Sequence, residues 1–355
     1  MNTCKVTIGS LLGLTLLVLT SSCGGGGIMG GGGTGGGGGP VGPSLYVTTN
    51  PDLVFSPPIS SILQFSSDSN GSVSPSSTVK GPSGITFEGL AVDVTGNLYV
   101  GGSIPSNNPA SQGQLEVLVY APGSNGMANP IRTIAGNSTG LGGFTQNSIS
   151  GLAVDSSGNV YVSSYLVQGG LINPGISVFP STANGDVAPA NVIIMTGNAT
   201  LSPGQIALDP AGNIYVAAVA LSGPGAILIF ASDSTGTVPP TSTLAGPDTM
   251  INQLVGVAVD GAGNIYVANG NSGGAMPSIL EFSAGSTGNV APIRTISGSA
   301  TMLGAPGNLT VDSAGNIYVL NELNILKFSP TATGNAAPAA TISSTLIGNF
   351  NIAVQ

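Results

Sequence analysis

Short apolar runs alternate with polar turn residues along most of the chain, and one combination of them occurs five times. The combination Gly-Leu-Ala-Val-Asp-Val-Thr-Gly-Asn-Leu-Tyr-Val covers residues 89–100, and its other copies cover 151–162, 205–216, 256–267 and 308–319. Apolar runs of this length, rich in Val, Ile and Tyr, predict buried β-strands, and the polar residues between them predict a tight turn. Each copy is therefore a pair of strands, and the regular period indicates a repeat architecture.

Each pair of strands carries one aspartate at its turn. These residues lie 62, 54, 51 and 52 positions apart and are Asp93, Asp155, Asp209, Asp260 and Asp312. An aspartate bonds the backbone amides of a turn, and the glycine three residues later supplies the positive φ that a short hairpin requires. Because the residue recurs in every copy, we interpret the five aspartates as turn-forming residues and not as ligands.

A second pattern, Gly-x-x-x-Pro-x-x-Thr, lies between the copies of the first. Its glycines are Gly71, Gly126, Gly236, Gly288 and Gly334, and a sixth copy at Gly185 has Val192 in place of the threonine. Proline cannot donate to a sheet ladder, so this pattern predicts the start of an edge strand. A further apolar run precedes it, as in Ile279–Ser283 and Ile325–Ser329. Each unit thus has four strands, a to d, in chain order.

Four antiparallel strands per unit are typical of a propeller blade. Residues 44–47 form a strand b without its strand a, and residues 351–355 form a strand a without the rest of its unit. Pairing the two completes a sixth blade and removes both open edges. We therefore predict an all-β, six-bladed β-propeller of four-stranded antiparallel blades over 44–355, closed by pairing the C-terminal strand with the N-terminal blade.

The apolar-Asp-x-x-Gly-Asn-Ile-Tyr-Val core resembles the repeat of the NHL family, and the resemblance covers residues 44–355. It implies a six-bladed propeller. It implies little about chemistry, because that superfamily includes lyases, hydrolases, receptors and interaction modules.

The N-terminus predicts export. Lys5 precedes an apolar run over 6–20, which is short for a membrane span, and small residues follow it. The sequence Leu19-Thr20-Ser21-Ser22-Cys23 resembles a bacterial lipobox, although leucine is usual where Thr20 stands. We predict a lipoprotein-type signal peptide over 1–23 that ends at an acylated Cys23. An ordinary secretory signal is the alternative.

Residues 24–43 contain fourteen glycines in twenty positions. Such a segment cannot bury enough apolar surface to fold, and we predict a disordered tether with a reach of about 25 Å. The chain after residue 23 has fourteen acidic and four basic residues, so it carries no basic stripe for nucleic acid or anionic lipid. We expect a monomer at the bacterial cell envelope, facing the periplasm or the exterior, that meets the membrane only through its lipid anchor.

Few residue types suited to catalysis are present. The chain has no histidine, and both of its cysteines lie within the first 23 residues. A Ser-His-Asp triad, a thiol nucleophile and a thiolate zinc site are therefore excluded from the propeller. The histidine-dependent sites of virginiamycin B lyase-like and amidating-lyase-like propellers cannot be carried over either.

Gluconolactonase-like propellers, which share this architecture, hold a divalent cation in the channel with Glu, Asn and Asp side chains. Glu88 directly precedes strand a, where other blades have Ser150, Gly204, Val255, Gly307 and Phe350. A calcium site needs six to eight oxygens. The candidate donors are Glu88, Glu322, Asn321 and Asn308. Scattered, solvated carboxylates are the alternative interpretation, and we expect no cofactor unless calcium binds there.

The two faces of a propeller differ. The b-to-c and d-to-a connections share one face, here called the loop face, and the aspartate turns share the other, the turn face. Polar candidates for ligand contact on the loop face are Tyr165, Asn173, Asn269 and Asn271. Arg132 and Arg294 precede the threonine of strand d, so we place them on the outermost strands.

These observations favour a non-enzymatic, lipid-anchored NHL-type propeller that binds a protein or glycan through its loop face. A calcium-dependent hydrolase or lyase with a metal at the channel mouth is one alternative. A structural component of the envelope or matrix is the other.

Overall fold

The structure is a computed structural model, and it describes residues 43–49, 59–104, 114–141, 148–168, 171–196, 201–220, 223–271, 274–347 and 351–355. The predicted signal peptide with Cys23 lies outside the described residues. So does the predicted tether, apart from Pro43. No helix among the described residues is long and apolar enough to span a bilayer.

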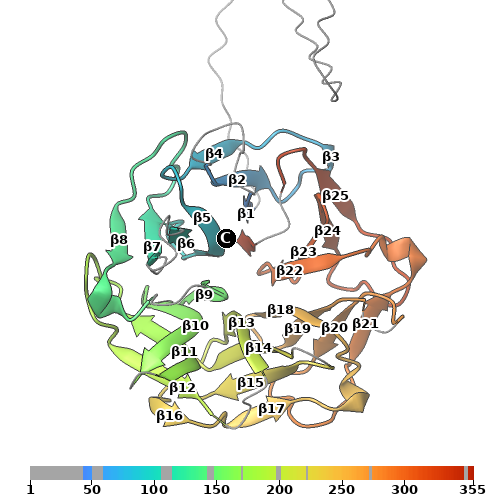
Figure 1. The fold of residues 1–355 in the computed structure, drawn as a ribbon. Coiled ribbons are helices and arrows are strands. Elements are labelled where there is room, and N and C mark those ends of the chain that lie inside the picture. The colour runs from blue at the N-terminus through green and yellow to red at the C-terminus, as the bar shows by residue number, and fades with distance from the viewer. Residues whose placement is uncertain are drawn as a thin grey trace, which may run out of the picture. The chain divides into compact units, whose positions relative to one another are not determined.

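The described chain folds into six antiparallel blades arranged as a ring (Figure 1). Strands a to d run from the channel to the rim of each blade, so the predicted fold class is confirmed. Blade 1 consists of β26 (Ile352–Val354), β1 (Ser44–Thr48), β2 (Ser61–Ser66) and β4 (Ser77–Lys80). Blade 2 consists of β5 (Thr86–Val92), β6 (Leu98–Ile104), β7 (Gln114–Tyr120) and β8 (Arg132–Ala135). Blade 3 consists of β9 (Gly151–Val154), β10 (Val160–Gln168), β11 (Leu171–Phe179) and β12 (Asn191–Met195).

The other three blades repeat this order. Blade 4 consists of β13 (Leu201–Leu208), β14 (Ile214–Ala220), β15 (Ala226–Phe230) and β17 (Ser242–Leu244). Blade 5 consists of β18 (Leu254–Val259), β19 (Ile265–Asn269), β20 (Ser278–Phe282) and β21 (Arg294–Ser297). Blade 6 consists of β22 (Pro306–Val311), β23 (Ile317–Asn321), β24 (Asn324–Phe328) and β25 (Ala340–Ser343). Two short strands, β3 (Gly71–Ser72) and β16 (Gly236–Val238), join the outer edges of blades 6 and 3.

The C-terminal strand closes the ring as predicted. β26 pairs antiparallel with β1, with Val354 opposite Leu45 and Ile352 opposite Val47. Gln355 stands where the other blades have the turn aspartate, and its backbone N–H donates to the Ser44 carbonyl at 3.1 Å. The same backbone bond joins Asp93 to Asn97 at 3.1 Å in blade 2. The interrupted turn of blade 1 is thus rebuilt from two distant parts of the chain.

The second sequence pattern joins neighbouring blades. Each of its six glycines forms a parallel β-contact with strand d of the preceding blade. The pairs are Val79–Gly126, Ile134–Gly185, Ile193–Gly236, Leu244–Gly288, Ile296–Gly334 and Ile342–Gly71. All six glycines have a positive φ, between 59° and 78°, which a residue with a side chain rarely adopts. The glycine segment of each blade therefore covers part of the outer edge of the preceding blade. The proline of the pattern lies just before strand d.

Each junction between blades holds its own apolar core in the described chain. Six clusters of buried side chains lie between successive blades. A blade is covered on both faces by its neighbours, so its strands are continuous apolar runs instead of alternating ones. Tyr99, Phe179 and Phe282 are among the largest fully buried side chains.

Candidate functional site

The aspartate turns all have the same hydrogen bonds. In blade 2, Asp93 Oδ1 accepts from the backbone N–H groups of Thr95 and Asn97, both at 2.9 Å. Its Oδ2 accepts from Asn97 Nδ2 at 2.8 Å and from the Tyr99 hydroxyl at 3.0 Å. The bonds from residues i+2, i+4 and i+6 recur around the four other aspartates. The carboxylate thus ties the turn to the buried tyrosine of strand b.

The central channel is lined by strand a of each blade and has a volume of about 260 Å³. An inner strand has no partner on its channel side, so its backbone groups there need water or side chains. Gln205 and Thr310 are the polar side chains among the lining residues in the described chain.

Three side-chain amides meet at the loop-face mouth of this channel. Asn351 Oδ1 accepts from Gln205 Nε2 at 2.7 Å and from Asn308 Nδ2 at 2.8 Å. Asn351 Nδ2 donates to the backbone carbonyl of Glu88. The four residues belong to blades 1, 4, 6 and 2, and blade 4 lies opposite blade 1 in the ring. We call Gln205, Asn308 and Asn351 the amide bridge, because together they span the channel.

The first position of strand a helps to explain how the amide bridge fits into the channel. Three blades have glycine there, Gly89, Gly151 and Gly256, and three have an amide. A Cβ at Gly256 would lie 2.9 Å from Asn308 Oδ1, and a Cβ at Gly151 would lie 2.8 Å from the Cα of Gln205. Glycine in blades 3 and 5 therefore leaves room for the amide residues of blades 4 and 6. The amides at this position are visible in the sequence. The position before it, where only Glu88 stands out, gives no sign of Gln205 or Asn351.

Glu88 lies beside the amide bridge but does not use its carboxylate there. The residue sits in a β-bulge, where the pairing of β5 with β6 shifts between Phe87 and Gly89. Its Oε1 accepts from the Ser103 hydroxyl at 2.7 Å, and its Oε2 accepts from the Ile149 backbone N–H at 2.9 Å. Burial raises the pKa of Glu88, and the bonds from Ser103 and Ile149 only partly oppose that effect.

The other three proposed calcium donors have separate surroundings. Asn321 Oδ1 accepts from the Gly304 backbone N–H at 2.9 Å, and its Nδ2 donates to the Met302 carbonyl at 3.1 Å. Glu322 is exposed at the β23–β24 turn and has a φ of 56°. Asn308 belongs to the amide bridge. Within the described ranges, no three His, Cys, Asp or Glu side chains come together as a metal site. The structure therefore brings only Asn308 to the place where Glu88 adjoins the channel.

The polar candidates on the loop face are mostly bonded within the fold. The Tyr165 hydroxyl donates to Ser202 Oγ at 2.7 Å. Asn269 is buried, accepts from the backbone of Asn252 at 2.8 Å, and donates to the Met250 carbonyl and the Ser278 hydroxyl at 3.1 Å. Asn173 is half-buried and also takes part in an interaction within the fold. Asn271 is exposed. Of the four, Asn271 alone is an exposed side chain.

Of the ten large exposed apolar side chains in the described chain, five lie on the loop face of the second half of the ring, and the other five lie in turns and connections of the turn face. Five Met and Leu residues there are 48–58 % exposed in the described chain, and they lie in successive connections from blade 4 to blade 1. They are Met250, Met276, Met302, Leu323 and Leu346. We call this set the loop-face apolar patch. Met250 and Met302 follow short 3-10 helices at equivalent positions and share a positive φ near 60°.

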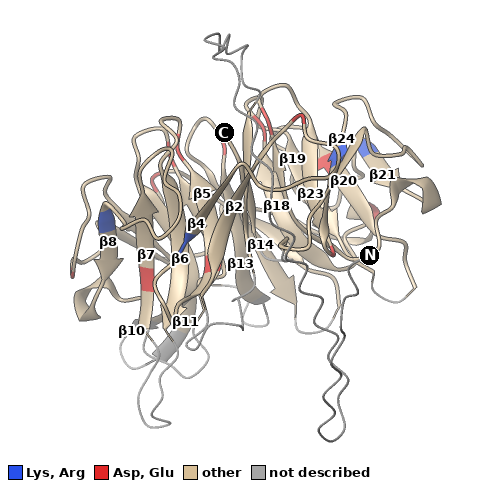
Figure 2. Ribbon diagram, turned by 90° about the horizontal axis from the view of Figure 1, so that it is seen from above, with Lys and Arg blue, Asp and Glu red and all other residues tan. Residues whose placement is uncertain are grey.

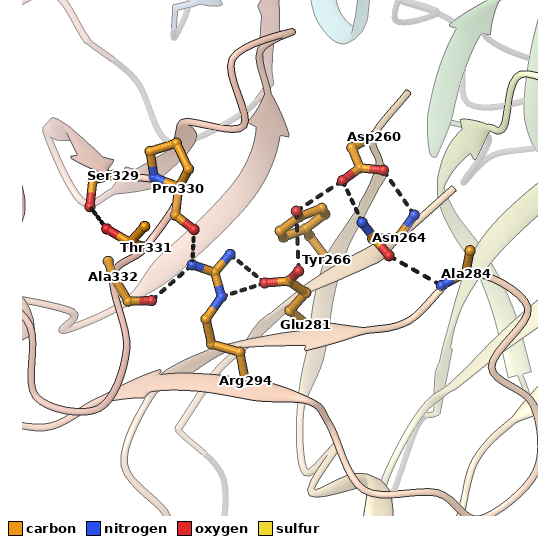
Figure 3. A network of polar contacts seen from close by, with 10 residues as sticks. All are labelled: Asp260, Asn264, Tyr266, Glu281, Ala284, Arg294, Ser329, Pro330, Thr331 and Ala332. Carbon is orange, nitrogen blue, oxygen red and sulfur yellow. Dashed lines mark hydrogen bonds and ion pairs between the residues drawn. The ribbon is translucent and has the colours of Figure 1, made fainter. Parts of the chain in front are cut away.

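Two arginines, placed on the outermost strands from the sequence, join blades on the turn face. Arg294 of β21 pairs with Glu281 of its own blade and donates to the carbonyls of Pro330 and Ala332 in blade 6 (Figure 3). Arg132 of β8 donates to the equivalent carbonyls of blade 3, Ser181 and Ala183. Figure 2 shows how sparse the positions of charged residues are over the ribbon.

Comparisons with known proteins support the fold alone. No protein-family model matches the sequence, and no curated protein matches it. A crystal structure of a protein of unknown function from Bacteroides caccae is similar over 88 % of this chain and 98 % of that chain, with a TM-score of 0.56 and 11 % sequence identity.

Two further solved structures are similar over smaller parts of the chain. The PQQ-bound aldose sugar dehydrogenase of Streptomyces coelicolor covers 73 % of this chain and 80 % of its own, with a TM-score of 0.44 and 14 % identity. The major Malassezia sympodialis allergen Mala s 1 covers 71 % of this chain and 75 % of its own, with a TM-score of 0.44 and 16 % identity.

Proposed function

We propose that the chain is a non-enzymatic NHL-type propeller, held at the cell envelope by acylation of Cys23, that binds a protein partner through its loop face. The observation that carries this proposal is the loop-face apolar patch. Soluble domains rarely gather large exposed apolar side chains without a use for them. The signal and tether predicted over 1–43 would place this face outside the cytoplasm.

The chemistry of the patch favours a protein over a glycan. Methionine is flexible and polarizable, and it is enriched where protein surfaces bind partners. Glycan sites favour aromatic platforms, but the chain has no tryptophan, and the Tyr165 hydroxyl is bonded to Ser202. A glycan partner is accordingly an outcome that would count against the proposal.

Charge defines the partner further. Glu322 lies beside Leu323 of the patch, and Asp248 lies two residues before Met250. The four basic residues of the propeller lie on strands β4, β8, β21 and β24, outside the loops that hold the patch. We infer a partner surface that combines apolar side chains with basic ones, because opposite charges steer association.

The test uses the full acylated chain with a photo-reactive residue in place of Met276. Cross-linking in the envelope should give one discrete protein adduct. Replacing Met250, Met302 and Leu323 together with serine should reduce the adduct about tenfold, because buried apolar anchors carry most interface energy. Val94→Ser is the matched control, since Val94 is an 81 % exposed apolar residue on the turn face.

Three outcomes would refute parts of this proposal. An adduct of equal yield in the triple variant would refute the patch, and an adduct only with glycan would refute the protein partner. Anchoring is tested separately by mass spectrometry of the N-terminus after expression in a lipoprotein-competent host. A soluble, unacylated product would refute anchoring at Cys23.

A calcium-dependent hydrolase or lyase is the second candidate. The amide bridge favours it, because three amides and the Glu88 carbonyl meet at the mouth of the channel. A hard cation prefers such oxygen donors but usually gathers several carboxylates. The Glu88 carboxylate is instead bonded to Ser103 and Ile149, so we rank this candidate second.

A further inference from the structure

Arg132 has unused donors at the junction of blades 2 and 3. Its Nη1 donates to the carbonyls of Ser181 at 2.5 Å and Ala183 at 3.1 Å, and its Nη2 donates to the Tyr99 hydroxyl at 3.3 Å. A guanidinium has five N–H groups. Two of the five, one of them on Nε, therefore have no partner among the described residues.

The junction of blades 5 and 6 shows which group can bond the Nε and Nη2 edge of such a guanidinium. Arg294 bonds the two equivalent carbonyls, Pro330 and Ala332, in the same way (Figure 3). Its Nε and Nη2 both contact the Glu281 carboxylate, which comes from the facing strand c. The residue that faces Arg132 on strand c is Val119. Blade 2 thus keeps the guanidinium of this pair but lacks the carboxylate.

A pocket of about 270 Å³ opens beside Arg132 on the turn face. Arg132 and Tyr99 line it together with the turns of blades 2 and 3, which contribute Thr95, Ser156 and Ser157. Ser156 and Ser157 are exposed, and serine hydroxyls both donate and accept hydrogen bonds. The pocket is slightly smaller than most ligand sites, which measure roughly 300–1,000 Å³, so it suits a ligand of about monosaccharide size.

The aspartates at the pocket do not prevent an anion from binding. Both oxygens of Asp93 and of Asp155 already accept hydrogen bonds within their turns. The equivalent pair at the other junction, Asp260 and Asp312, has the same turn bonds, and the Glu281 carboxylate lies there against Arg294. The Tyr266 hydroxyl contacts both Asp260 and Glu281, so the fold itself accommodates a second carboxylate beside such a turn.

We propose that this pocket binds a small hydroxylated carboxylate of the sugar-acid class. The ligand carboxylate pairs with Arg132 in the way that Glu281 pairs with Arg294. Its hydroxyls bond the serines of the blade 3 turn. The site is on the turn face and is independent of the protein partner proposed for the loop face.

The test is a titration of the full chain with D-glucuronate at low ionic strength, with D-glucose as the neutral control. Glucuronate should bind and glucose should bind at least about tenfold more weakly, because the charge-assisted pair with arginine is lost. Arg132→Gln should reduce glucuronate affinity about tenfold. Lys80→Gln, which removes one positive charge from another blade, should leave it unchanged.

Val119→Glu provides a second route to the same conclusion. A glutamate there supplies the missing partner from within the chain, so it should weaken glucuronate binding about tenfold while Arg132 is retained. Thermal unfolding of each variant shows whether it is folded. Absence of glucuronate binding to the wild type, equal binding of glucose, or full binding by a folded Arg132→Gln variant would each overturn the proposal.

Discussion

Gln205 and Asn351 are 146 residues apart in the chain, yet the amide of one donates to the amide of the other at 2.7 Å across the mouth of the channel. Asn308 donates to the same oxygen at 2.8 Å. Because Asn351 directly precedes β26, the strand that closes the ring, its side chain links closure of the propeller to the shape of the channel mouth.

Replacing Asn351 with alanine should therefore weaken the whole ring. The change removes two accepted bonds and the bond to the Glu88 carbonyl, and it leaves the amide groups of Gln205 and Asn308 without their acceptor. We expect the free energy of unfolding to fall by about 2–3 kcal/mol, measured by denaturant unfolding. Asn271→Ala is the control, because Asn271 is exposed. A loss no larger than that of the control would contradict the bridge.

The turn aspartates should make the fold sensitive to acid. Burial raises the pKa of Asp93 and of Asp260, but hydrogen bonds from their turns outweigh it and lower each pKa below its usual value of 3.8. A carboxyl group whose pKa is lower in the folded state stabilises the fold at a pH above its pKa in the unfolded state. That stability is lost as the pH falls through the pKa of the folded state. Asp93→Asn should lower the Tm by roughly 2–4 °C at pH 7, with a smaller difference below pH ~3. The same difference in Tm at pH 7 and below pH ~3 would contradict a stabilising role for the ionised Asp93 carboxylate.

Glu116 should destabilise the protein at neutral pH. The residue is buried on β7, its Oε1 has no hydrogen-bond partner among the described residues, and burial raises its pKa. When a carboxyl pKa is higher in the folded state, stability is lost as the pH rises from the pKa of the unfolded state through the pKa of the folded state. Glu116→Gln should therefore raise the Tm at pH 7 but not at pH 3. Glu322→Gln, at an exposed site, should change neither, and an equal gain at both pH values would mean that charge is not the cause.

Calcium should have no effect on the thermal stability of the propeller. The Glu88 carboxylate and the Asn321 amide are already bonded to Ser103, Ile149, Gly304 and Met302. Binding to the native state alone would raise the Tm with ligand concentration. We expect the same Tm, by calorimetry, in millimolar calcium and in chelator. A calcium-dependent rise that Glu88→Gln abolishes would instead favour the hydrolase or lyase alternative.

Most of the fold could be predicted from the sequence, because a blade is built from local information. The run Ala-Val-Asp-x-x-Gly-Asn-Ile-Tyr-Val specifies two strands and their turn within a dozen residues. The five copies of that run specify five blades, and the strand fragments at 44–47 and 351–355 specify the sixth. The pairing of Ile352 with Val47 followed from the same pattern, since each end of the propeller lacked what the other end supplied.

The candidate sites depended on the tertiary structure, because side-chain direction and distance across a ring are not periodic in the sequence. A bulge directs the Glu88 carboxylate to Ser103 and Ile149, while only its carbonyl meets Asn351. Arg132 and Arg294 occupy the same repeat position, but only the fold shows that Glu281 faces one and Val119 the other. The sequence by itself determined the propeller and its closure. Folding alone decided which polar groups meet at the channel and between blades, since those contacts join residues from different repeats.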